Sequence, residues 1–152
     1  MIEKFKLMEE TSFAIADDHA LFRRAFIQMF TTGKKPMKLA AEAGNGKEMI
    51  EKLEPLNLPQ IIFLDTDMPV MNGIECCAYL SRHYPAIKII CMLMEEDEQL
   101  VITLLKTGAH GLVSKADDPR EIIDIVTRIL KGNERLPIIS GSFFYTYLPF
   151  RN

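Results

Sequence analysis

Short apolar segments alternate along the chain with longer segments in which apolar residues recur at helical spacing. The short segments predict strands over residues 12–16, 38–43, 61–64, 88–92 and 111–114. The segments between them predict helices over residues 20–30, 46–53, 74–83, 97–107 and 119–130. The last helix would carry an apolar stripe of Ile122, Ile123, Val126, Ile129 and Leu130.

Most of the predicted strands are apolar without alternation, which is typical of strands that helices cover on both faces. Strands that alternate with helices also favour parallel pairing. The pattern therefore predicts an α/β fold with a doubly wound, five-stranded parallel sheet. We expect the strand order 2-1-3-4-5, one of the two common orders of this class.

Composition fits one globular domain and excludes several functions. The chain has 152 residues, of which 48% are hydrophobic and 26% charged, and its formal net charge is −3. Lys and Arg cluster at most in pairs, so we expect no nucleic acid to be bound by this chain itself. The chain has no long apolar run, so we expect neither a secretion signal nor a membrane span. Cys76, Cys77 and Cys91 lack zinc spacing and are interpreted as buried residues of a cytoplasmic protein.

The chain divides into three segments on the same grounds. Residues 1–10 are interpreted as a leader, 11–132 as the domain, and 133–152 as a tail rich in aromatic residues. These aromatic residues are Phe143, Phe144, Tyr145, Tyr147 and Phe150. The tail either folds back on the domain or docks on another chain, because free aromatic clusters are unfavourable in water.

Charged residues follow three of the predicted strands. Asp17 and Asp18 come after the first strand, Asp65 after the third and Lys115 after the fifth. Ligands bind at the carboxyl ends of such strands, so we expect these side chains to converge. Two carboxylates about 5 Å apart repel by roughly 3 kcal/mol, and an oxygen-liganded Mg²⁺ would offset this repulsion. For Asp18 alone, a role as a helix cap is equally open.

Four stretches together resemble the receiver domain of two-component response regulators, in particular the NarL/LuxR-type branch, over about residues 11–135. They are IADDHALFRRAF (15–26), AEAGNGKEMIEKL (41–53), IIFLDTDMPVMNGIE (61–75) and KTGAHGLVSKADDPREI (106–122). The resemblance implies a flavodoxin-like fold and transfer of a phosphoryl group from a kinase phosphohistidine to Asp65.

The resemblance also implies roles for the neighbouring residues. Asp18 would bind Mg²⁺ directly, Asp17 through water, and Asp67 through its backbone carbonyl, with Asp65 as a further ligand. Lys115 would pair with the phosphoryl oxygens and so complete the catalytic pair with Asp65. The phosphoacceptor would transfer and lose its phosphoryl group by self-catalysis, without being an enzyme that turns over a separate substrate.

The chain departs from the family at the two positions that couple phosphorylation to shape. The family has Thr or Ser at the end of the fourth strand and an aromatic residue three positions before the lysine. Leu93 and Leu112 stand there in this chain. A hydrogen bond to a charged group is worth about 1.5 to 3 kcal/mol, comparable to a typical coupling energy between sites. We therefore expect weakened conformational switching.

Several alternatives remain open. The chain could be a pseudo-receiver that acts as a protein-interaction module, or the receiver fragment of a NarL/LuxR-type DNA-binding regulator, since twenty residues after Gly132 are too few for a helix-turn-helix domain. The Asp65-Thr66-Asp67 spacing also occurs in haloacid dehalogenase-like phosphatases, but Pro69 and the upstream acidic pair fit the receiver better. The expected partners are a sensor histidine kinase or phosphotransfer protein, with a possible homodimer and no membrane.

Overall fold

The computed structural model describes residues 11–32, 36–95, 97–132 and 137–141. In chain order they form β1 (Ser12–Ala16), α2 (Ala20–Thr31), β2 (Lys38–Ala43), α3 (Gly46–Lys52), β3 (Ile61–Asp65), α4 (Gly73–His83), β4 (Lys88–Leu93), α5 (Glu98–Thr107), β5 (Gly111–Ser114), α6 (Pro119–Lys131) and β6 (Ile138–Ile139). The strands form one parallel sheet of order β2-β1-β3-β4-β5-β6. The predicted α/β fold and the order of the first five strands are confirmed.

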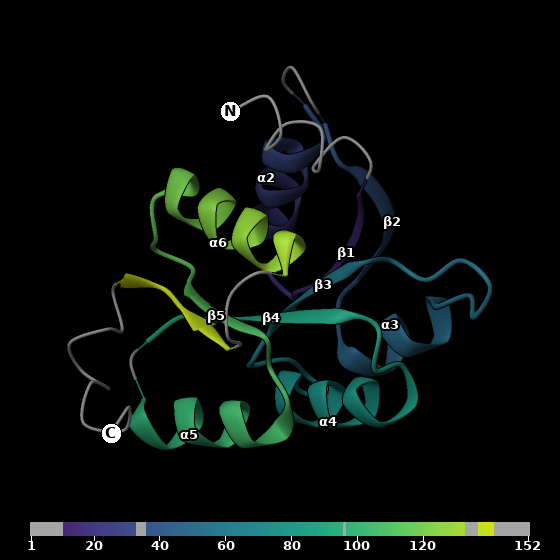
Figure 1. Cartoon of the computed structure of the whole chain (residues 1–152). Helices are drawn as coiled ribbons and strands as arrows, with labels where there is room; N and C mark the ends of the chain where they lie inside the picture. Colours follow the sequence, from purple (N-terminus) through teal and green to yellow (C-terminus); the bar gives the residue numbers. More distant parts are fainter. Residues whose placement is uncertain (1–10, 33–35, 96, 133–136, 142–152) are drawn as a thin grey trace.

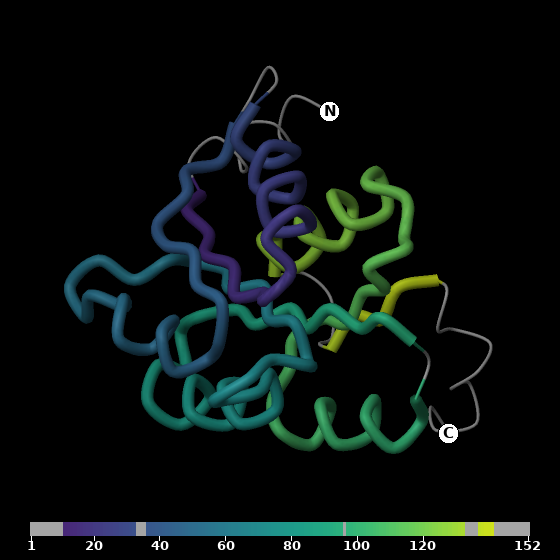
Figure 2. Tube along the Cα trace, turned by 180° about the vertical axis from the view of Figure 1, so that it is seen from behind, coloured from purple at the N-terminus to yellow at the C-terminus, as the bar shows by residue number. Residues whose placement is uncertain are grey.

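Helices cover both faces of the sheet. Helices α2 and α6 lie on one face, and α3, α4 and α5 lie on the other (Figure 1). The same two layers are visible from behind, with the sheet between them (Figure 2). Every strand from β1 to β5 except β2 is therefore buried on both sides for most of its length, as the uninterrupted apolar runs predicted.

The two faces of the sheet carry different cores. Successive residues of a strand point to opposite faces, so Phe13 and Ile15 pack toward α2 and α6, whereas Ala14 and Ala16 pack toward α3, α4 and α5. On the first face, the ring of Phe63 lies 4.6 to 6.0 Å from the rings of Phe13, Phe26 and Phe30. These large side chains fix α2 against the sheet. The acidic residues Asp17 and Asp18 come just before this helix in the chain.

The helix ends follow from local hydrogen bonding. Asn72 begins α4 with a capping box, in which its side chain accepts from the Glu75 amide at 2.9 Å and its own amide donates to the Glu75 carboxylate at 3.3 Å. Gly108 and Gly132 end α5 and α6 with left-handed φ angles of 118° and 67°. The loop between Gly108 and the start of β5 at Gly111 lies at the amino edge of the sheet and is therefore short.

Strand β6 corrects the prediction of five strands. Its two residues, Ile138 and Ile139, lie in the segment interpreted as a tail and pair with Gly111 and Leu112 of β5. The Ile138 amide donates to the His110 carbonyl and the Ser140 amide to the Leu112 carbonyl, both at 2.9 Å. Two apolar residues are too few to show the period of a strand, so the hydrophobic pattern of the sequence did not predict β6. Its pairing is set by the free edge of β5.

The aromatic residues of the predicted tail, at 143–150, and the predicted leader, at 1–10, lie outside the described residues. Within the described parts, none of the helices combines the length and the apolar character that crossing a membrane requires.

Candidate functional site

The site lies at the carboxyl edge of the sheet, where β1, β3 and β5 end. Asp17 follows β1, Asp65 is the last residue of β3, and Lys115 follows β5. Strands β1 and β3 are direct neighbours, and β4 lies between β3 and β5. The backbone amide of Lys115 donates to the carbonyl of Leu93 at 2.9 Å, which fixes the start of the loop that carries the lysine. The structure thus brings together residues that are far apart in the sequence.

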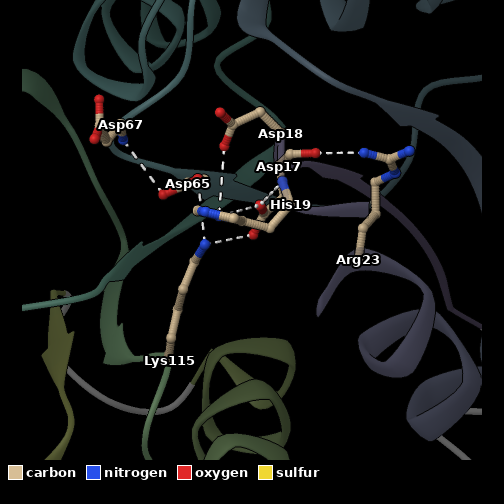
Figure 3. A network of polar contacts seen from close by, with 7 residues as sticks. All are labelled: Asp17, Asp18, His19, Arg23, Asp65, Asp67 and Lys115. Atoms are coloured by element: carbon tan, nitrogen blue, oxygen red, sulfur yellow. Dashed lines mark hydrogen bonds and ion pairs between the residues drawn. The ribbon is translucent and has the colours of Figure 1, made fainter. Parts of the chain in front are cut away.

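Asp17, Asp65 and Lys115 form a buried ionic triad (Figure 3). The lysine Nζ lies 2.7 Å from Asp17 Oδ2 and 3.2 Å from Asp65 Oδ2. All three side chains are buried: Lys115 is 5% exposed, Asp17 0% and Asp65 3%. Beyond this ion pairing, neither Oδ2 atom has a well-directed hydrogen bond. One ammonium therefore serves two carboxylates, and the triad keeps a net negative charge.

Asp18 and His19 extend the triad toward solvent. One ligand atom each of Asp17, Asp18, His19 and Asp65 lies within 4.8 Å of the others. His19 Nδ1 is 3.5 Å from an oxygen of each of the two neighbouring aspartates, and its amide donates to Asp17 Oδ1 at 2.8 Å. His19 thus orients the acidic pair, a contact that the sequence did not reveal.

Asp67 takes part through its backbone. Its amide donates to Asp65 Oδ1 at 3.3 Å, while its exposed carboxylate points away from the triad (Figure 3). The predicted ligand at this residue is the backbone carbonyl, so the direction of the side chain does not enter that prediction.

The surroundings raise the pKa of Asp65 to about 6. Burial is the largest cause and the negative charge of Asp17 the second, while the Lys115 ammonium and the Asp67 amide pull in the opposite direction. The carboxylate is therefore destabilised in the folded protein. A cation that approaches it would relieve this unfavourable charge.

Two residues of α2 support the site and were missed by the sequence analysis. Arg23 donates from Nη1 to the Asp17 carbonyl and from Nε to the Glu42 carboxylate, the latter at 3.0 Å. The ring of Phe22 lies 4.6 Å from Lys115 Nζ, a cation–π contact. Their only signal in the sequence is their place in the first turns of the helix after the acidic pair.

The donor set fits a hard divalent cation. Besides the His19 nitrogen it consists of carboxylate oxygens, two of which are buried and carry no well-directed hydrogen bond. Mg²⁺ prefers such oxygen ligands and commonly retains water on its open side, and Asp18 lies on the exposed side of the cluster. The acidic pocket is thus suited to bind Mg²⁺.

Leu93 and Leu112 are fully buried at the two predicted switch positions. Both are 0% exposed and belong to the core between the sheet and α3, α4 and α5. The nearest hydroxyl in register is that of Ser114, which pairs with Leu93 across β4 and β5, but Ser114 Oγ accepts from the Ala116 amide at 3.1 Å. An apolar side chain therefore occupies each position.

Comparison with known proteins places this geometry in a family. The model of the response regulator receiver domain matches residues 13–127. The transcriptional regulatory protein DegU of Brevibacillus brevis is 32% identical over 118 residues, which cover 78% of this chain and 49% of that protein. The chemotaxis protein CheY of Thermotoga maritima is 32% identical over 117 residues, which cover 77% of this chain and 95% of that protein.

A solved structure gives the same result for the fold. The LuxR family response regulator from Aurantimonas sp. SI85-9A1 superposes with a TM-score of 0.81 at 22% identity, over 93% of this chain and 97% of that one. The chain spans about half the length of several curated relatives that it matches. The resemblance drawn from the sequence motifs is confirmed, and the chain belongs to the response regulator receiver domains of two-component systems, with NarL/LuxR-type regulators among its relatives.

Proposed function

We propose that Asp65 accepts a phosphoryl group in a two-component phosphorelay. The observation that carries the proposal is the Asp65 carboxylate, held at the sheet edge 3.2 Å from Lys115 Nζ and within the acidic cluster. A carboxylate oxygen attacks phosphorus, the bond from phosphorus to the donor breaks, and the donor leaves with the electron pair. The product is an acyl phosphate on Asp65.

The other residues of the site stabilise this transfer. Lys115 pairs with the incoming phosphoryl oxygens, which carry more negative charge than the carboxylate that it contacts in the free protein. Asp17, Asp18 and Asp65, with the Asp67 carbonyl, would hold Mg²⁺, which when bound neutralises part of the phosphoryl charge. His19 and Arg23 position the acidic segment through the contacts described above.

Intact mass spectrometry after incubation with acetyl phosphate and Mg²⁺ tests the phosphoacceptor. We expect one added phosphoryl group on the parent chain and on Asp67→Asn, a matched control that removes an exposed carboxylate from the same loop. Asp65→Asn should lose the modification. A folded parent chain that stays unmodified, also with beryllofluoride as the analogue, would instead support a pseudo-receiver interaction module.

The chemistry proposed is stoichiometric. Each chain would carry one phosphoryl group, and its transfer and loss would be self-catalysed at Asp65 and Lys115. Steady hydrolysis of an unrelated phosphomonoester would contradict this proposal and favour a phosphatase.

We further propose that phosphorylation changes the shape of this chain less than in relatives with a hydroxyl and an aromatic switch residue. Leu93 and Leu112 are buried and offer no hydrogen bond to a phosphoryl oxygen. Leu93→Thr combined with Leu112→Tyr should enlarge the NMR shift changes that beryllofluoride induces around α5 and β5. Equal shift changes in the variant and the parent chain would discredit this explanation.

The phosphodonor is proposed to be a sensor histidine kinase or a phosphotransfer protein of the cytoplasm. A homodimer is the second proposed assembly, because one structural relative is described as RcsB dimers bound to DNA. From the same relatives we also propose, as an alternative, that this chain is the receiver part of a longer transcriptional regulator. Light scattering with and without beryllofluoride would reveal dimerisation, and an unchanged monomer mass at high concentration would argue against it.

A further inference from the structure

We propose that an apolar hollow beside Asp65 favours phosphodonors whose leaving group is a bulky apolar carboxylate, that is, aromatic or branched acyl phosphates. The inference rests on the proposed role of Asp65 and specifies the class of small donor that the site accepts best.

The hollow has a volume of about 380 Å³ and lies between the start of α2, the end of β4 and the loop after β5. Its lining consists of His19, Leu21, Phe22, Met94, Lys115 and Ala116. Lys115 forms one wall, and its Nζ is 3.2 Å from Asp65 Oδ2. Asp65 itself does not line the hollow, and Lys115 is the residue that connects the hollow with the proposed phosphoacceptor.

Two of the walls are large apolar side chains that the fold leaves in water. Leu21 is 86% exposed and Met94 is 68% exposed. In the described parts of the chain, only Leu56 and Val70 are exposed large apolar residues besides these two. Since exposed apolar side chains gain free energy when a ligand covers them, their concentration beside the pocket points to an apolar ligand group.

The lining can accept an anion once Mg²⁺ offsets the charge of Asp17, Asp18 and Asp65, the carboxylates that contact Lys115 and His19. Its two titratable side chains are Lys115 and His19, and it contains no carboxylate. An acyl phosphate matches both properties, because its phosphoryl end is anionic and its acyl end can be apolar. A donor oriented with phosphorus toward Asp65 would lay its acyl group against Leu21 and Met94.

The transfer step balances without another reactant. An Asp65 oxygen forms a bond to phosphorus, and the bond between phosphorus and the acyl oxygen breaks. The electron pair of that bond leaves on the free carboxylate, and no proton is required. Burial of about 60 Å² of a phenyl group against the hollow corresponds to roughly a tenfold preference for a benzoyl donor over an acetyl donor.

The test compares benzoyl phosphate with acetyl phosphate as donors to the full chain in the presence of Mg²⁺, with the initial rate of Asp65 modification followed by intact mass. The benzoyl-to-acetyl rate ratio should fall about tenfold in the double variant Leu21→Ser with Met94→Ser. This comparison between variants cancels the different intrinsic reactivities of the two donors. Leu56→Ser, which removes another exposed leucine that does not line the hollow, should leave the ratio unchanged.

An unchanged ratio in the double variant would overturn the inference while leaving the phosphoacceptor role intact. If neither donor modifies Asp65, the proposed function fails. The affinity of the hollow for an apolar anion is then tested by the binding of two phosphonates. Benzylphosphonate should then bind about tenfold more tightly than methylphosphonate to the parent chain, but not to the double variant. Equal binding of the two phosphonates would overturn the inference as well.

Discussion

Replacing Asp65 by Asn should stabilise the folded protein at neutral pH when no divalent cation is bound. The pKa of Asp65 is raised from 3.8 to about 6, chiefly by burial and by the charge of Asp17. A difference of about 2 pKa units corresponds to roughly 3 kcal/mol, at about 1.4 kcal/mol per unit. The side chain is 3% exposed, so solvent screens this energy little.

The sign follows from the protons that each state binds. Between pH 3.8 and about 6 the folded state holds the Asp65 proton more tightly than the unfolded state, so stability falls as the pH rises through this range. The destabilisation is complete above the folded pKa, and it is absent below the unfolded pKa. An asparagine side chain carries no charge at any of these values and avoids the loss.

Urea denaturation in the presence of a chelator, at several pH values, measures the difference. We expect Asp65→Asn to exceed the parent chain by about 3 kcal/mol near pH 8 and by little near pH 3.5. Asp67→Asn serves as the control, with an expected change within about 0.5 kcal/mol. Saturating Mg²⁺ should narrow or reverse the gap, because the ion binds the folded parent chain more tightly than the variant. A variant that is equally stable or less stable at high pH without cations would refute the reasoning.

Three further changes test the framework of the fold, each by urea denaturation. Gly73→Ala should destabilise the protein by several kcal/mol and slow the modification of Asp65, because the added Cβ would lie 2.3 Å from the Asp65 carbonyl oxygen; a parent-like midpoint would contradict this. Val70→Asn should stabilise by about 1 kcal/mol, since Val70 is exposed and has a φ of 67°, which a β-branched residue adopts poorly; a loss of stability would count against strain. The His110 ring accepts from the Ile89 amide at 3.0 Å, and burial lowers its pKa below 6.5, so protonation of this ring should subtract stability from the parent chain as the pH falls below 6.5, against the gain that Asp65 brings. His110→Asn should lose less over that range, and an identical pH profile would exclude the ring as the cause.

The sequence predicted the fold well because periodic signals determine it. Strands buried on both faces produce unbroken apolar runs, and parallel topology brings their carboxyl ends to one edge of the sheet. The convergence of Asp17, Asp65 and Lys115 follows from these two facts alone. The family model supports the same interpretation.

The missed contacts depend on side-chain directions or on single short segments. Whether Arg23 reaches the Asp17 carbonyl is decided by the rotation of α2, which the packing of its phenylalanines fixes. The left-handed backbone at Val70 is not expected from its residue type. Neither feature has a periodic signature, so neither could be predicted without coordinates.

The pairing of β6 with β5 has a practical consequence for recombinant work. The family match ends at residue 127. A chain cut there, or at Gly132, would lack Ile138 and Ile139. A truncated clone of this kind would leave the carbonyls of His110 and Leu112 unbonded on an open strand, where strands of other molecules could add and cause aggregation. Expression clones for spectroscopy or crystallisation should therefore extend at least through Gly141, whose amide also bonds the Glu121 carboxylate at 2.7 Å.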